Sequence, residues 1–90
     1  MLREGEKWFY EVSEFFSSLT DIDNITYCGF DRANFGSQCK TCGVFEVSPK
    51  VIFTAEFLSK VQSYTSDRVL CMQVFETIGV YRHCVVVILR

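Results

Sequence analysis

The residues best suited to chemistry in this chain are cysteines. Cys39 and Cys42 enclose two residues and precede a glycine in QCKTCGV, the spacing of a zinc knuckle, in which two thiolates hold one side of the ion. Cys28 precedes this pair as a third candidate ligand, and His83 or Cys84 is the fourth if sheet pairing brings it alongside. A tetrahedral site of this kind would stabilise a small domain with a thin core. One hypothesis is therefore a zinc-stabilised binding domain.

The opposing interpretation is that these cysteines are small apolar residues without chemistry. A single closely spaced pair is a weak motif, and no second pair accompanies it. Redox chemistry is disfavoured, because a reactive Cys-x-x-Cys opens a helix after a strand, whereas this pair precedes a strand-like run. Inert thiols are favoured over zinc, and no other cofactor is expected.

Catalysis has little support in the sequence. His83 is the single histidine and lies in an apolar run, where a histidine is usually structural. A thiol enzyme that pairs His83 with Cys28, Cys39 or Cys42 is the weakest of the hypotheses, since such partners meet only in space. No glycine-rich phosphate loop leads into a helix. We predict that the chain is not an enzyme.

Length and composition predict a single domain over residues 1–90. Aromatic residues make up 16% of the chain, more than a core of this size absorbs, so some are expected at a surface that meets a partner. The net charge of −2, without a basic run, disfavours nucleic acid. The longest apolar run, Cys84–Leu89, is too short to span a membrane. Charges where an export signal needs apolar residues, and an odd number of cysteines, predict a cytoplasmic location.

The elements that must position these residues follow from the pattern of apolar positions. Residues 4–19 predict a helix, because their large apolar side chains recur at helical spacing. Ile25–Phe30 and Gly43–Val47 predict strands, the second of which is ended by Pro49. Residues 31–42 have no periodicity and predict a loop.

The C-terminal part allows two interpretations between Arg68 and Gly79. It is either a helix closed by Gly79 or the first arm of a hairpin. We favour the hairpin, with a three-residue loop over residues 77–79. That register places Phe75 opposite Tyr81, an aromatic pair that stabilises a sheet.

The expected architecture is an α+β sandwich of two layers. An antiparallel sheet of about four strands carries two helices on one face, in the order helix, strand, strand, helix, strand, strand. The second helix covers Thr54–Ser66, with Thr54 as its N-cap. Val85–Leu89 is apolar on both strand faces, which predicts a central or covered strand. An exposed edge there would pair with a second copy, so a homodimer is expected.

A weak internal repeat suggests where a partner binds. Each half has the order helix, strand, strand, and CGVFEV at residues 42–47 aligns with IGVYRH at residues 78–83. In this alignment the first half gains a loop of about a dozen residues, and long loops are often functional. We therefore predict a small protein–protein interaction module, an inhibitor or adaptor that occupies a surface of another protein. Since arginine and aromatic residues dominate binding hot spots, the predicted contact residues are Asp31, Arg32, Asn34, Phe35 and Lys40.

Overall fold

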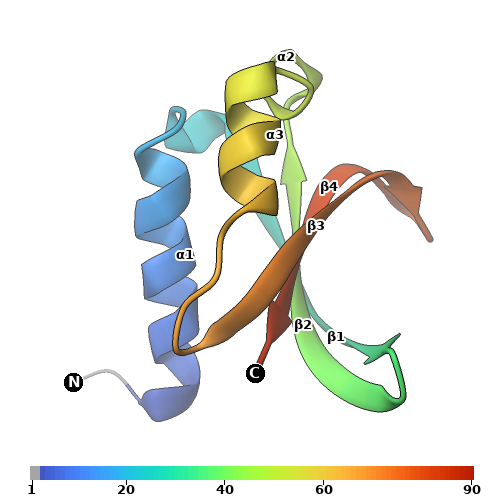
Figure 1. Cartoon of the computed structure of the whole chain (residues 1–90). Helices are drawn as coiled ribbons and strands as arrows, with labels where there is room; N and C mark the ends of the chain where they lie inside the picture. Colours follow the sequence, from blue (N-terminus) through green and yellow to red (C-terminus); the bar gives the residue numbers. More distant parts are fainter. Residues whose placement is uncertain (1–2) are drawn as a thin grey trace.

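The computed structural model, which describes residues 3–90, has four strands in one antiparallel sheet of order β1-β2-β4-β3. The strands are β1 (Ile25–Phe35), β2 (Gln38–Val47), β3 (Val69–Ile78) and β4 (Tyr81–Leu89). Two main helices, α1 (Lys7–Ser17) and α3 (Ala55–Gln62), stand side by side against one face of the sheet (Figure 1). The predicted α+β class and the order of elements are confirmed.

Three shorter elements connect these parts: η1 (Glu4–Glu6), η2 (Ile22–Asn24) and α2 (Pro49–Ile52). The stripe predicted for the first helix is confirmed, since Trp8, Val12 and Phe16 are buried at successive turns of α1. Thr54 caps α3 as predicted, because its hydroxyl oxygen accepts the main-chain N–H of Phe57 at 3.3 Å. Within residues 3–90, none of the helices has the length and apolar character that crossing a bilayer requires.

The prediction of a loop over residues 31–42 is wrong. These residues continue β1 and begin β2, and the two strands pair from Asp31 opposite Cys42 to Phe35 opposite Gln38. Only Gly36 and Ser37 form the turn, and Gly36 has a φ of 65°, which a two-residue hairpin turn requires. The hairpin end is exposed on both faces, so no apolar alternation marks it in the sequence.

The β3–β4 hairpin is confirmed, but its predicted register is wrong. Ile78 pairs with Tyr81, and Phe75 lies opposite Cys84 instead of Tyr81. The turn is the two residues 79–80, with Gly79 at a φ of 59°. Both hairpins therefore turn on a glycine at the first central position, and the aligned segments 42–47 and 78–83 are not equivalent in the fold.

The sheet is apolar on both faces. The main core lies under the helices, where Phe45, Val85 and Val87 meet α1 and α3. The opposite face carries a second buried cluster of Cys42, Val44, Cys84, Val86 and Ile88. Because β4 lies between β2 and β3 and residues 84–88 are buried, the prediction of a central strand is confirmed.

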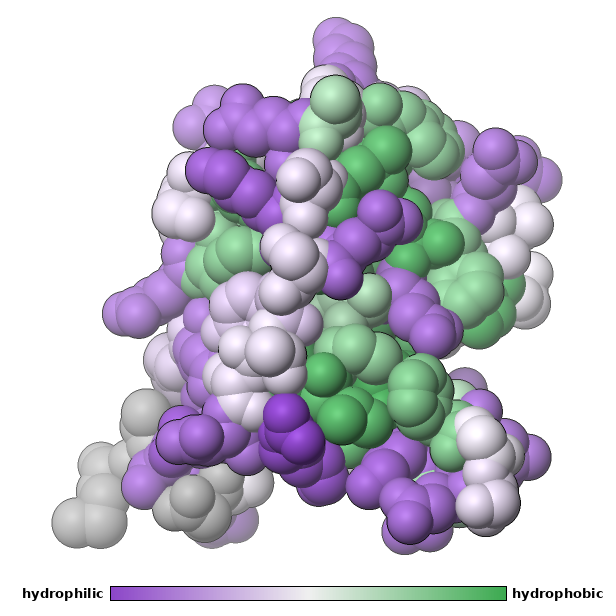
Figure 2. Space-filling model, viewed as in Figure 1, coloured by the Kyte–Doolittle hydropathy of each residue, from purple (hydrophilic) through white to green (hydrophobic). Residues whose placement is uncertain are grey.

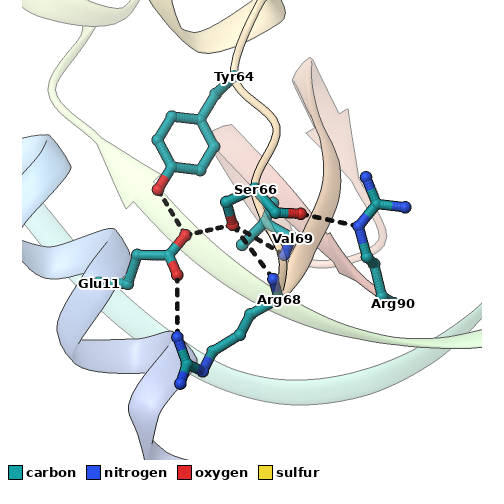
Figure 3. A network of polar contacts seen from close by, with 6 residues as sticks. All are labelled: Glu11, Tyr64, Ser66, Arg68, Val69 and Arg90. Atoms are coloured by element: carbon teal, nitrogen blue, oxygen red, sulfur yellow. Dashed lines mark hydrogen bonds and ion pairs between the residues drawn. The ribbon is translucent and has the colours of Figure 1, made fainter.

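A polar network fixes α1 to the connection between α3 and β3 (Figure 3). One carboxylate oxygen of Glu11 accepts the hydroxyl groups of Tyr64 and Ser66, both at 2.5 Å. The other lies 3.8 Å from the guanidinium of Arg68. The hydroxyl oxygen of Ser66 in turn accepts a hydrogen bond from the main-chain N–H of Val69 at 3.1 Å. Through these contacts, Glu11 holds α1 against the residues at the start of β3.

The Tyr64 hydroxyl predicts how stability depends on alkaline pH. Burial, and then the hydrogen bond to Glu11, raise the pKa of Tyr64 from 10.0 to about 12. Because the pKa of Tyr64 is higher in the folded protein, its neutral hydroxyl group stabilises the fold below pH 10. This contribution to stability is lost as the pH rises towards 12. We expect the stability advantage of the wild type over Tyr64→Phe, measured by urea unfolding, to shrink between pH 10 and pH 12. The titration of all other groups is common to both proteins and cancels in the comparison. A stability difference that stays constant across that range would contradict the raised pKa of Tyr64.

Candidate functional site

The predicted zinc ligands do not form a cluster. Cys39 is exposed and Cys42 is buried on β2, Cys28 lies at an irregularity of β1, and His83 belongs to β4. Among residues 3–90, no group of three or more His, Cys, Asp or Glu side chains is arranged to hold a metal ion. Zinc binding stays a prediction, without support from the arrangement of its proposed ligands.

The weakest hypothesis, a thiol enzyme, uses the same cysteines and the same histidine. Burial is the main cause that raises the pKa of Cys28 and of Cys42, which favours the neutral thiol over the nucleophilic thiolate. The Cys42 thiol donates to the main-chain oxygen of Asp31 at 3.4 Å. A thiol enzyme also stays a prediction, and these environments do not favour it.

His83 has an unusual conformation. It is the only non-glycine residue with a positive φ in the described chain, at 52°, and its buried Nδ1 has no hydrogen-bond partner. Its ring meets Phe53 edge to face, with centroids 5.5 Å apart. The neighbouring cavity of about 330 Å³ contains side chains of both charges, including Glu46 and Arg82. This mixture does not select one class of ligand.

The predicted contact residues lie on strands and not in a loop. Asp31, Arg32, Asn34 and Phe35 are exposed residues of β1, whereas Lys40 is half-buried on β2. β1 is an edge strand, because β2 is its only pairing partner among residues 3–90. These residues therefore share one strand edge, apart from Lys40.

A shallow apolar groove separates the ends of the two hairpins. Figure 2 shows hydrophobic side chains gathered there, beside a notch in the surface. The groove encloses about 160 Å³, and Asp31 and Arg32 lie at one wall. Ile78 and Tyr81 form the opposite wall, and Val44 and Val86 are among the apolar residues between them. This groove contains two of the predicted contact residues.

A larger apolar groove lies between the start of α1 and β1. It encloses about 260 Å³, and its lining contains five aromatic side chains: Trp8, Phe9, Tyr10, Tyr27 and Phe30. Tyr10 is 52% exposed and Phe30 58%, whereas Trp8 is almost fully buried at 5%. We call these residues, with Gly5 and Glu6, the aromatic groove. It is the best-defined candidate for a binding site.

A β-bulge creates this groove. Tyr27 and Phe30 are three residues apart, so a regular strand would direct them to opposite faces. The register of β1 shifts between Tyr27 and Gly29, where Gly29 adopts a φ of 112°. Tyr27 consequently pairs with Phe45 and Phe30 with Gly43, two positions on the helix-covered face. This site was not predicted from the sequence, although Gly29 inside a strand is a known signal of a bulge.

The rings of the groove pack edge to face. The Phe9 and Tyr27 centroids are 4.9 Å apart with planes at 68°, and Tyr27 and Phe30 lie 6.3 Å apart at 90°. The Trp8 ring contacts the rings of both Tyr27 and Phe30, and its centroid lies 5.2 Å from that of Phe30. Such contacts favour a fixed arrangement of the rings. The groove is thus a preformed surface.

Comparisons of the chain with protein-family models, with curated proteins and with solved structures found no match.

Proposed function

We propose that the chain is a small protein–protein interaction module that binds an extended segment of a partner in the aromatic groove. The observation that carries the proposal is the position of this groove between α1 and an edge strand. A groove next to an open strand edge suits strand addition, in which main-chain hydrogen bonds give affinity and side-chain pockets give specificity. By occupying a segment of its partner in this way, the chain would act as an inhibitor or an adaptor.

The charged residues of the β1 edge restrict which segments can pair with it. The main-chain N–H of Arg32 donates to the carboxylate of Asp31 at 2.7 Å. Charged side chains on an edge strand discourage indiscriminate pairing with other strands. A partner segment that pairs along β1 would meet Phe30 at the groove and then Asp31, Arg32 and Phe35 further along the strand. The proposal thus includes most of the contact residues predicted from the sequence.

Selection from a random peptide library displayed on phage tests this function. We expect the wild type to select peptides whose affinity falls at least about tenfold in Phe30→Ser, since a central aromatic contact often contributes 2 kcal/mol or more. Phe53→Ser is the matched control, because Phe53 is similarly exposed, at 44%, but lies near α2, away from the groove. Amide chemical shifts of the wild type map where the peptide binds.

Two results would contradict the proposal. One is a library that yields no peptide above background. The other is a set of peptides that bind Phe30→Ser and the wild type equally well. Circular dichroism of each variant verifies that an effect on binding is not a loss of the fold.

A further inference from the structure

We propose that the aromatic groove takes an alkylammonium group, the side chain of a lysine, with or without N-methylation, in the partner segment. This inference rests on the proposed function and names the chemistry that its groove recognises. Among the described residues that line the groove, Glu6 alone is charged. Five aromatic rings and one carboxylate therefore line the space, and both ring faces and carboxylates attract cations.

The rings present the electrostatics that a cation requires. The face of an aromatic ring is negative, and a cation within about 6 Å of the centroid is attracted to it. Phe30 and Tyr10 are each more than half exposed, so much of their ring surface is uncovered. Trp8, the strongest type of ring for this interaction, lies behind Phe30 with the two planes at 59°. The exposed rings of Phe30 and Tyr10 thus offer the surface that a cation can contact, and Trp8 packs behind Phe30.

The size of the groove suits a single side chain. Pockets for drug-sized ligands usually enclose about 300–1,000 Å³, and this groove encloses about 260 Å³. An ammonium head group on a flexible stem fits such a space, because its methylene groups cover apolar surface while the charge stays near Glu6. An anionic group would meet the carboxylate and the negative ring faces, which disfavours phosphate and carboxylate ligands.

The source of the ammonium group follows from the neighbouring strand. β1 passes the groove as an edge strand, so a polypeptide bound there can form main-chain hydrogen bonds that a free amine or a lipid head group cannot. The nearest basic residues in the sequence, Arg3, Lys7 and Arg32, are not among the described lining residues of the groove. A lysine of the partner thus meets no cation within the described lining.

Titration with matched small probes tests the inference. Trp8 is the single tryptophan of the chain, so its fluorescence reports directly on the groove. The probes are the N-acetyl amides of lysine and trimethyllysine, and of the neutral tert-butyl isostere, in which carbon replaces the charged nitrogen. We expect trimethyllysine to bind at least about fivefold more tightly than the isostere, as cation–π attraction predicts.

Three variants define the site. Phe30→Leu keeps apolar volume but removes a ring face, and we expect it to abolish most of the preference for the charged probe. Glu6→Gln should weaken both ammonium probes severalfold and leave the isostere unchanged. Phe53→Leu, the exposed phenyl group away from the groove, should change nothing.

The outcomes separate this inference from the proposed function. Equal affinity for the charged and neutral probes, or no binding of either, would overturn the ammonium site even if groove-dependent peptides were selected. Binding of the charged probe together with peptides that ignore Phe30→Ser would instead keep the ammonium site and reject the peptide mode. Sedimentation analysis adds a third outcome: a dimer that dissociates in Phe30→Ser would assign the groove to a second copy and overturn the inference.

Discussion

We expect Gly43→Ala to lower the free energy of unfolding by about 1–3 kcal/mol, the usual cost of overfilling a packed core. A β-carbon at Gly43 would lie 2.5 Å from one atom of the Trp8 ring and 2.9 Å from a second. The ring has little room to retreat, because Trp8 is 5% exposed and contacts Phe30 and Phe45. Replacing glycine also restricts the unfolded chain, which favours folding by about 0.4–1 kcal/mol, so the steric term is the larger. Urea unfolding of the two proteins measures the difference.

Two further variants distinguish the steric cause from a general effect of alanine. Gly5→Ala is the matched control, since a β-carbon there has no atom within 4 Å, and it should leave the stability unchanged or raise it by up to about 1 kcal/mol. Trp8→Phe removes the ring atoms that the new methyl group would meet. In that background Gly43→Ala should become neutral or stabilising. If the loss has the same size in both backgrounds, the contact with Trp8 is not its cause.

The overall architecture was predictable because the strongest patterns in the chain are long and regular. The stripe from Trp8 to Phe16 and the apolar run of β4 each fix an element and its burial. The first hairpin was not predictable by the same means. Its distal half, residues 31–42, is mostly exposed, so the apolar alternation that identifies a strand is absent. The remaining signal was Gly36, a turn residue whose positive φ the sequence does not reveal by itself.

The candidate site was partly predictable, for a related reason. The excess of aromatic residues correctly indicated exposed rings, since Tyr10, Tyr27 and Phe30 are all exposed. Their convergence depends on the bulge at Gly29, which changes the face to which Phe30 belongs. A shift of one residue in a strand reverses every later side chain. Spacing along the sequence therefore could not bring Tyr27 and Phe30 together without the backbone.

The same limit applies to the cysteine pair. Its spacing matches a zinc knuckle, but residues 38–47 form a continuous strand, which directs positions 39 and 42 to opposite faces. In β2 the two cysteines differ in burial, with Cys42 at 3% exposed and Cys39 at the exposed end. The strand, and not the motif, decides where each thiol lies.

The second large effect is expected at Glu11, where we predict that Glu11→Ala lowers the free energy of unfolding by about 2–3 kcal/mol. The carboxylate accepts two hydroxyl groups, and hydrogen bonds to a charged group contribute about 1.5–3 kcal/mol each without being additive. Removing it leaves the part-buried hydroxyl groups of Tyr64 and Ser66 without their acceptor. The ion pair with Arg68 adds little, because its 3.8 Å separation and partial exposure leave it screened by solvent. Thermal and urea unfolding both measure the loss.

A graded series identifies the cause of that loss. Glu11→Gln keeps an oxygen that can accept from one hydroxyl group, so it should lose only about 1 kcal/mol. Glu14→Ala removes an exposed carboxylate from the same helix and should change stability by less than about 0.5 kcal/mol. In a double-mutant cycle, Glu11→Ala should cost less in a Tyr64→Phe background, because one donor is already gone. If Glu11→Ala costs no more than Glu14→Ala, the network does not hold α1 against the entry of β3, and the aromatic stripe of the helix alone fixes its position.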